Sequence, residues 1–155
     1  MSAETILTAC GRVAIGDVVR EGGRQLASRD YAEAEAEDFS GDSVRDIALP
    51  EWLGDTSLLF PVVELAALGL KVREAHHVRL YATCGVEDHI DNMDGLSVAV
   101  VLHSDGFTFK SAAQSLPLKA GDWFVFDDRL PHEAREKRTS TTLLVLTAPL
   151  EAIQT

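Results

Sequence analysis

The sequence contains little cysteine. Only Cys10 and Cys84 occur among 155 residues, too few for a disulfide framework, and their spacing does not match a zinc knuckle. We expect both to be free thiols, although the count leaves a single bridge between them open. Stability must therefore come from a hydrophobic core, and a chain of this length suffices for one domain.

Long apolar runs and positive charge are also scarce. No stretch approaches the roughly 20 apolar residues of a membrane-spanning helix. The opening residues, MSAETILTAC, lack the basic and apolar regions of a secretory signal, so we expect a cytoplasmic protein. The net charge of −11 opposes non-specific binding to nucleic acid or to an anionic membrane. A small molecule or a peptide or protein segment is the expected partner, and the oligomeric state stays open.

We expect one domain over residues 1–155, in which an N-terminal helical covering segment, 1–75, precedes a β core, 76–150. The covering segment mixes several signals. They predict a strand over 12–19, a break at Gly22 and Gly23, a solvated helix face or loop over 32–38, and helices over 43–53 and 61–71. The last of these, PVVELAALGLK, opens with proline and repeats apolar residues at helical spacing.

From residue 76 the composition changes. Short runs rich in β-branched and aromatic residues are divided by Gly, Asp, Asn and Pro: HHVRLYATC, LSVAVVLHS, FTFKS, DWFVFDD and TTLLVLTA. Such runs are typical of antiparallel strands. With helices before them, they predict a mainly β fold with N-terminal helices, arranged as a sandwich or jelly roll.

Two histidines and an aspartate stand out within these strands. In VEDHIDNMDG, residues 86–95, His89 and Asp91 are two positions apart and would lie on one face of a strand. Alone, the pair is better explained as a polar strand end followed by a turn. In a jelly roll, however, chain-distant strands face each other, so His132 could meet them at the mouth of the barrel. Two imidazoles and one carboxylate are the ligands of mononuclear non-haem Fe(II) oxygenases.

These segments resemble the 2-oxoglutarate and Fe(II)-dependent dioxygenase superfamily, and within it the prolyl-hydroxylase-like branch. The resemblance covers about residues 76–148 and rests on DHIDNMDG, GDWFVFDDRLPHEA and RTS. It implies a double-stranded β-helix (jelly roll) core with Fe(II) bound by His89, Asp91 and His132. It also implies a hydroxylase that consumes O₂ and 2-oxoglutarate and releases succinate and CO₂. The substrate would be a C–H bond of a protein or peptide side chain or of a small metabolite.

The resemblance further implies which residues hold 2-oxoglutarate. Arg138 would pair with the distal carboxylate, because its planar fork makes two parallel bonds that a lysine cannot make. Tyr81 would donate to the same carboxylate, and Ser140 would share the face of Arg138. Only five residues separate His132 from Arg138, fewer than is usual in the family, which leaves two neighbours as fallback anchors, Arg135 and Lys137.

One alternative function remains, a cupin-like sensor or binding module that holds a metal without oxygenase activity. It requires His89, Asp91 and His132 but not Arg138, so 2-oxoglutarate binding separates the two.

Other polar residues have simpler interpretations. In HSDG, which places His103 and Asp105 in a second His-x-Asp, Asp105 and Gly106 predict a hairpin turn. His76 and His77 are predicted to be surface or packing residues. Asp122 is predicted to be a turn acid. The remaining predictions are opposite faces for Asp127 and Asp128, opposite faces for Trp123 and Phe124, and no role for Cys84.

Overall fold

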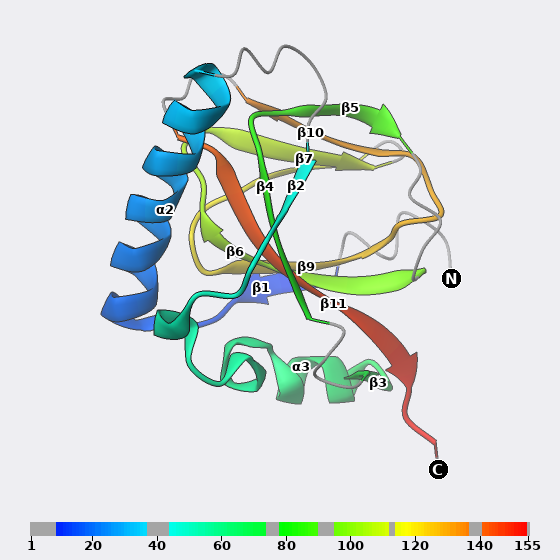
Figure 1. The fold of residues 1–155 in the computed structure, drawn as a ribbon. Helices are drawn as coiled ribbons and strands as arrows, with labels where there is room; N and C mark the ends of the chain where they lie inside the picture. The colour runs from blue at the N-terminus through cyan, green and yellow to red at the C-terminus, as the bar shows by residue number, and fades with distance from the viewer. Residues whose placement is uncertain are drawn as a thin grey trace.

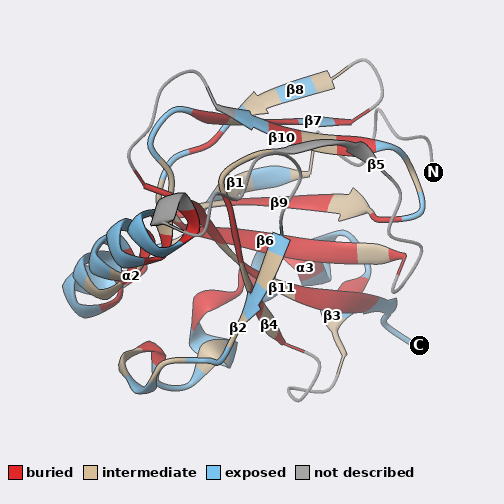
Figure 2. Ribbon diagram, turned by 45° about the horizontal axis from the view of Figure 1, so that its top comes forward, coloured by how far each residue is buried: buried red, intermediate tan, exposed pale blue. Residues whose placement is uncertain are grey.

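The structure is a computed structural model that describes residues 9–36, 44–73, 78–89, 95–111, 114–136 and 141–154. The chain forms three layers, in which helices cover one face of a larger sheet and a smaller sheet covers the other (Figure 1, Figure 2). Among the described helices, none combines the length and the apolar character needed to cross a membrane.

Within the described ranges the larger sheet has seven strands, which come from both early and late parts of the chain. Its order is β1 (Cys10–Arg12), β9 (Asp122–Asp127), β6 (Leu96–His103), β11 (Leu143–Ala152), β4 (Arg79–Thr83) and β2 (Val44–Ile47), with β3 (Leu70–Val72) paired to β11. The smaller sheet has four strands in the part of the chain that the structure describes, in the order β5 (Val86–His89), β10 (His132–Glu136), β7 (Phe107–Ser111) and β8 (Gln114–Pro117).

The path of the chain confirms the predicted jelly roll. From β4 onward it alternates between the sheets, with β4, β6, β9 and β11 in the larger one and β5, β7, β8 and β10 in the smaller one. Neighbouring strands in both sheets pair antiparallel. The turn at Asp105 and Gly106 is present, but the predicted hairpin is wrong, because this turn carries the chain from β6 in one sheet to β7 in the other.

Two hydrophobic clusters hold the layers together. The outer cluster lies between the larger sheet and the helical layer, whereas the inner cluster joins residues of both sheets. Strand β9 contributes to both, because successive side chains point to opposite faces. Trp123 belongs to the outer cluster and Phe124 to the inner one, which confirms the opposite faces expected for them.

The predicted strand over 12–19 and the break at Gly22 and Gly23 are wrong. Strand β1 ends at Arg12, and one long helix, α2 (Gly16–Ala36), contains both glycines. A Cβ at Gly22 would lie 2.5 Å from the Trp52 ring, and one at Gly23 would lie 3.0 Å from the carbonyl oxygen of Leu102. The glycines therefore allow the helix to approach its neighbours closely, and packing outweighs their low helix propensity.

The other N-terminal predictions have mixed outcomes. The helix predicted over 43–53 is wrong, because strand β2 (Val44–Ile47) is followed by the short 3-10 helix η1 (Glu51–Leu53). A second short 3-10 helix, η2 (Thr56–Leu59), comes next. The helix predicted over 61–71 is confirmed as the shorter α3 (Val62–Ala67). Three strands of the larger sheet also come from residues 1–75, so this segment does more than cover the core.

Candidate metal centre

His89 and His132 are Cα partners in the smaller sheet. Strand β10 pairs antiparallel with β5, and His132 lies opposite His89 on one side and opposite Ser111 of β7 on the other. Residues directly opposite in an antiparallel pair have Cβ atoms about 4.5–5.5 Å apart and lie on one face. The sequence-based expectation that these strands face each other across the barrel is wrong, since they are hydrogen-bonded neighbours.

A register shift accompanies this histidine pair. Ala134 lies opposite Val86, so two steps along β10 correspond to three steps along β5. One extra residue in β5 at this point is the pattern of a β-bulge. Bulges bend a strand and redirect its side chains, and they are common beside functional sites.

The side chain of His132 is buried and held in one orientation. It is 5% exposed, and its Nδ1 lies 2.8 Å from the carbonyl oxygen of Leu130. A carbonyl oxygen can only accept, so Nδ1 carries the proton and the neutral ring has its lone pair at Nε2. In metal-binding histidines, a hydrogen bond of this kind at the other ring nitrogen fixes the tautomer.

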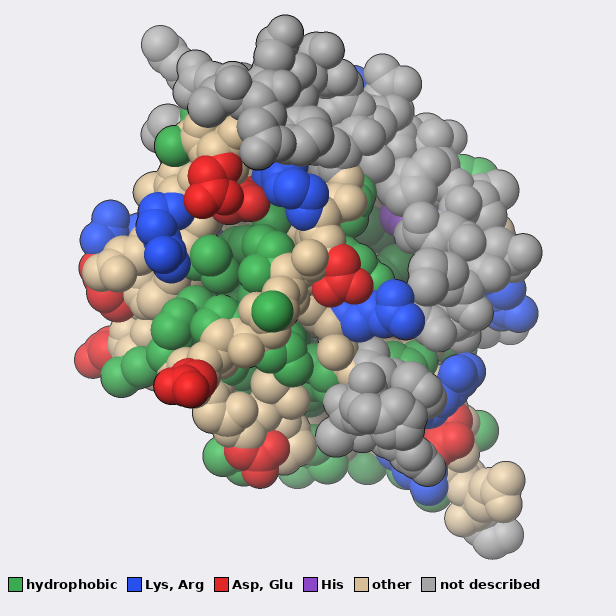
Figure 3. All heavy atoms as spheres, in the orientation of Figure 1, with side chains coloured by type: hydrophobic (Ala, Val, Ile, Leu, Met, Phe, Trp, Pro, Cys, Tyr) green, Lys and Arg blue, Asp and Glu red, His purple; other side chains and the backbone are tan. Residues whose placement is uncertain are grey.

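Aromatic rings pack against His132 from both sheets. The ring centroid of Phe109 on β7 lies 5.8 Å from that of His132, and that of Phe126 on β9 lies 5.4 Å away. Phe126 comes from the larger sheet, so the imidazole faces the space between the sheets. In the space-filling view a histidine side chain lies beside hydrophobic side chains in a hollow of the molecular surface (Figure 3).

The turn before His132 contains two acids with different tasks. Asp127 accepts two hydrogen bonds from the Arg129 guanidinium, at 2.9 and 2.8 Å. Arg129 holds the pKa of Asp127 below its usual range, and the nearby His132 makes a smaller contribution in the same direction. Asp128 is buried and accepts from the amide of Gly95 at 2.7 Å. These different surroundings agree with the opposite faces expected for the two acids.

Several predicted site residues lie outside the described part of the chain. These are Asp91, Lys137, Arg138 and Ser140, together with His76 and His77, and the side chain of His89 is not described either. Among the described residues, no group of three or more His, Cys, Asp or Glu could hold a metal ion. The proposed ligand set is untested by this result, because it includes Asp91.

The described part of the chain limits which residues could bind 2-oxoglutarate. Arg135 is exposed and pairs with Glu133, which lies on the same face of β10, at 2.8 Å. His132 and Ala134, which alternate with them on the other face, are buried. Arg135 therefore points away from the space between the sheets and is a poor fallback anchor. The last strand, β11, begins only at Leu143, after the segment that holds Arg138.

Tyr81 lies in the middle of β4. Its neighbours Leu80 and Ala82 are fully buried in the outer cluster, so alternation turns Tyr81 toward the smaller sheet. Tyr81 is half-buried and lies opposite Val145 of β11, which packs on the inner cluster. Its position is compatible with a ligand-binding role in the interior of the barrel.

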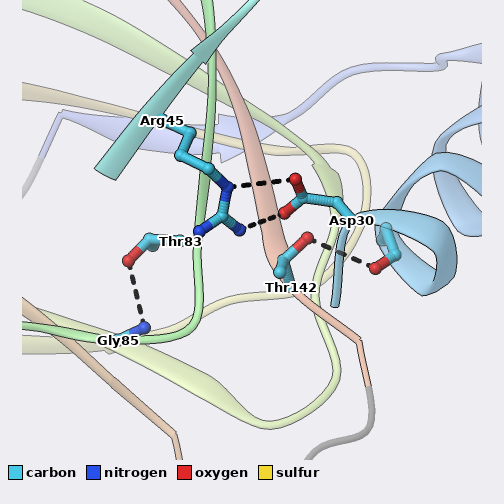
Figure 4. A network of polar contacts seen from close by, with 6 residues as sticks. Asp30, Arg45, Thr83, Gly85 and Thr142 are labelled. Atoms are coloured by element: carbon cyan, nitrogen blue, oxygen red, sulfur yellow. Dashed lines mark hydrogen bonds and ion pairs between the residues drawn. The ribbon is translucent and has the colours of Figure 1, made fainter. Parts of the chain in front are cut away.

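A polar network fixes the elements behind this strand (Figure 4). Arg45 of β2 pairs with the buried Asp30 of α2 through two hydrogen bonds, while the hydroxyl of Thr142 donates to the carbonyl of Ala27 at 3.4 Å. The hydroxyl of Thr83 accepts from the amide of Gly85 at 3.0 Å in the turn that leads into β5. The first two contacts tie α2 to β2 and to the residue before β11, and the third fixes the turn between β4 and β5.

The remaining polar residues take structural positions. His103 Nε2 lies 3.1 Å from the Thr141 hydroxyl, and burial lowers the pKa of His103. The carboxylate of Asp122 accepts from the amide of Lys119 at 2.8 Å, which confirms a turn acid. Cys10 and Cys84 are free thiols, as expected.

Comparison with known proteins supports the fold. No protein-family model and no curated protein matches the chain. Among solved structures, AviO1 from Streptomyces viridochromogenes Tue57 matches 96% of this chain and 95% of its own, at 13% identity and a TM-score of 0.53. The chain has a double-stranded β-helix (jelly-roll) fold.

Two further structures are similar over different lengths. A prolyl-4-hydroxylase from Pseudomonas putida matches 99% of this chain and 100% of its own, at 14% identity and a TM-score of 0.49. An RmlC-like cupin protein from Desulfovibrio desulfuricans matches 52% of this chain and 80% of its own, at 24% identity and a TM-score of 0.36. At these identities and TM-scores neither structure transfers an activity to this chain.

Two residues with defined positions were missed by the sequence analysis. Asp128 was considered only as half of an acid pair, although it bonds to Gly95 at the end of the His-x-Asp segment. Arg79 received no role, although it shares a strand face with Tyr81. The alternation in RLYAT, where Leu80 and Ala82 are apolar, could have indicated Arg79. The role of Asp128 could not be predicted without the geometry of the turn.

Proposed function

We propose that this chain is an Fe(II)- and 2-oxoglutarate-dependent oxygenase. It would hydroxylate a C–H bond of a peptide or protein side chain or of a small metabolite, with release of succinate and CO₂. The observation that carries the proposal is the cross-strand pairing of His89 with His132 beside a register shift. The described surroundings of His132 fit a metal ligand, because its Nδ1 bond directs the Nε2 lone pair for coordination.

In this proposal the iron ligands are His89, Asp91 and His132. Two imidazoles and one carboxylate on one face leave positions for a co-substrate and O₂, as in the facial triad of non-haem iron oxygenases. Bound Fe(II) would supply the oxygen activation, and the protein would orient the reactants. Phe109 and Phe126 contribute by excluding water beside His132 and by restricting its ring.

The turn at Asp128 positions the two segments that carry the proposed ligands Asp91 and His132. Asp128 lies between β9 and β10, four residues before His132, and it bonds to Gly95, four residues after Asp91. One side chain thus ties the chain on both flanks of the proposed centre. Arg138 with Tyr81 and Ser140 would bind 2-oxoglutarate, and Lys137 is the remaining fallback for the arginine.

An anaerobic titration tests this function. The purified chain is loaded with Fe(II) and titrated with 2-oxoglutarate while the weak visible charge-transfer band of the chelate is followed. We expect a band for the wild type, no band for His89→Ala or His132→Ala, and a weakened band for Arg138→Ala. His103→Ala is the matched control, since its ring bonds to Thr141 and not to the proposed centre.

Product formation completes this test. His89→Ala and Asp91→Ala should abolish succinate formation from 2-oxoglutarate, and turnover like the wild type in both would remove the site. Iron binding without a chelate band would instead favour the cupin-like binding module. Absence of iron binding in the wild type would contradict both functions.

A further inference from the structure

Arg79 is the sole lysine or arginine in the four central strands of the larger sheet. These strands, β4, β6, β9 and β11, are described over their full length. Leu80 and Ala82 are fully buried in the outer cluster, so alternation places Arg79 on the face toward the smaller sheet. Arg79 is half-buried, and the residues of the neighbouring strands on the same face are mostly apolar.

The strand register places Arg79 toward the end of the barrel that holds His132. Arg79 lies opposite Thr147, Thr147 opposite Ala99, and Ala99 opposite Phe124, so these residues form one row across the sheet. The next row on the same face contains Ser97 and Phe126. Phe126 is the ring from the larger sheet that packs against His132.

The row beside Arg79 contains small side chains. Ala99 and Thr147 are the residues between Arg79 and Phe124, and both have small side chains.

Hydroxyl groups accompany the guanidinium on this face. Thr147 lies directly opposite Arg79, and Tyr81 is two residues further along β4. A planar guanidinium with adjacent hydroxyl donors is suited to a carboxylate, which accepts two parallel bonds from arginine. In a chain with a net charge of −11, a cation on this face would favour the binding of an anionic ligand.

We propose that Arg79, with Thr147 and Tyr81, binds a carboxylate group of a ligand that lies between the sheets beside His132. The inference rests on the proposed function for the identity of that ligand. The carboxylate belongs either to 2-oxoglutarate or to an acidic substrate. Arg79 would then be a binding residue of the reaction, in addition to or in place of Arg138.

Glutarate is the probe for this site. It carries the two carboxylates of 2-oxoglutarate but lacks the keto oxygen, so its binding to the iron-free chain reports the carboxylate site alone. Titration by NMR or calorimetry should show binding to the wild type and a loss of at least about tenfold in affinity for Arg79→Gln. Arg79→Lys should retain part of the affinity, because a point charge replaces the bidentate fork.

Two further variants keep the test decisive. Lys110→Gln is the matched control, since Lys110 is exposed on β7, between the buried Phe109 and Ser111. Tyr81→Phe keeps the ring and removes the hydroxyl, and we expect it to weaken glutarate binding by at least about threefold. If Arg79→Gln does not fold, Tyr81→Phe decides. Wild-type affinity in the folded variants, or no glutarate binding to the wild type, would overturn the proposal.

Competition identifies the source of the carboxylate. If 2-oxoglutarate displaces glutarate in the iron-loaded chain, Arg79 holds the co-substrate. If both bind together, Arg79 holds a carboxylate of the substrate. The glutarate titration contains no iron, so it tests the carboxylate site independently of the oxygenase. Glutarate binding that depends on Arg79, without a chelate band in the iron titration, would contradict the proposed oxygenase and support the carboxylate site. A chelate band with no effect of the Arg79 variants on either ligand would support the oxygenase and contradict the carboxylate site.

Discussion

Asp128 and Gly95 are joined by two hydrogen bonds. The amide of Gly95 donates to Oδ1 of Asp128 at 2.7 Å, and the amide of Asp128 donates to the carbonyl of Gly95 at 2.9 Å. The two residues are far apart in the sequence but lie at the ends of the segments that carry Asp91 and His132. The pair therefore positions two parts of the proposed metal centre relative to each other.

Removing the Asp128 side chain should loosen this connection. We expect Asp128→Ala to lower the free energy of unfolding by about 1–3 kcal/mol, because it leaves the Gly95 amide without its buried acceptor. It should also weaken Fe(II) binding, whereas Asp128→Asn keeps an acceptor oxygen and should do less harm. Urea unfolding and an Fe(II) titration measure the two effects, with the exposed Asp105→Ala as control. Unchanged stability and iron affinity in Asp128→Ala would show that the turn has no positioning role.

His103 should make the stability depend on pH. Burial lowers its pKa in the folded chain below the ordinary value of 6.5. The unfolded chain therefore takes up the proton first, and the free energy of unfolding should fall as the pH decreases below about 6.5. His103→Gln removes this contribution. Urea midpoints between pH 7 and pH 5 should consequently fall less steeply in the variant, and parallel curves for the two proteins would refute the assignment.

The ion pair between Arg45 and Asp30 should matter far more than an exposed one. Asp30 is buried and the Arg45 side chain is 22% exposed, so Arg45→Met leaves a carboxylate without its partner in the protein interior. We expect a loss of about 2–3 kcal/mol, somewhat less than for a fully buried pair. Arg24→Met breaks the exposed pair with Glu21 and should cost far less, because water screens both charges. Equal losses in chemical denaturation would contradict this ranking.

Gly22 should not tolerate a side chain despite its helical position. Alanine has the higher helix propensity by about 1 kcal/mol, but its Cβ would meet the Trp52 ring. We expect Gly22→Ala to destabilise the chain by about 1–3 kcal/mol through overpacking. Ser28→Ala, at an exposed position of the same helix, is the control and should change stability by under about 0.5 kcal/mol. A stabilised Gly22→Ala would mean that α2 does not pack closely on Trp52.

The sequence predicted the β core better than the segment before it. Runs such as LSVAVVLHS and DWFVFDD are long and strongly β-branched or aromatic, and they became β6 and β9. Helix α2 was missed because two adjacent glycines normally interrupt a helix, and only contacts with Trp52 and Leu102 explain them. Those contacts join residues that are distant in the sequence, so no local pattern contains them.

The candidate site shows the same limit. Residue type and spacing were enough to select His89 and His132, because few side chains bind metals. They could not reveal that the two strands are direct neighbours, which depends on the path of the chain between sheets. Arg79 was overlooked for a related reason, since its importance comes from the absence of any other cation on the central strands of the larger sheet.

Pulsed EPR of the vanadyl-substituted chain tests the central claim most directly, because it counts the imidazole nitrogens bound to the metal. We expect two coordinated imidazoles in the wild type and in His103→Ala, and one in each of His89→Ala and His132→Ala. A wild-type spectrum without bound imidazole, or one that neither substitution changes, would contradict a metal centre at the His89 and His132 pair.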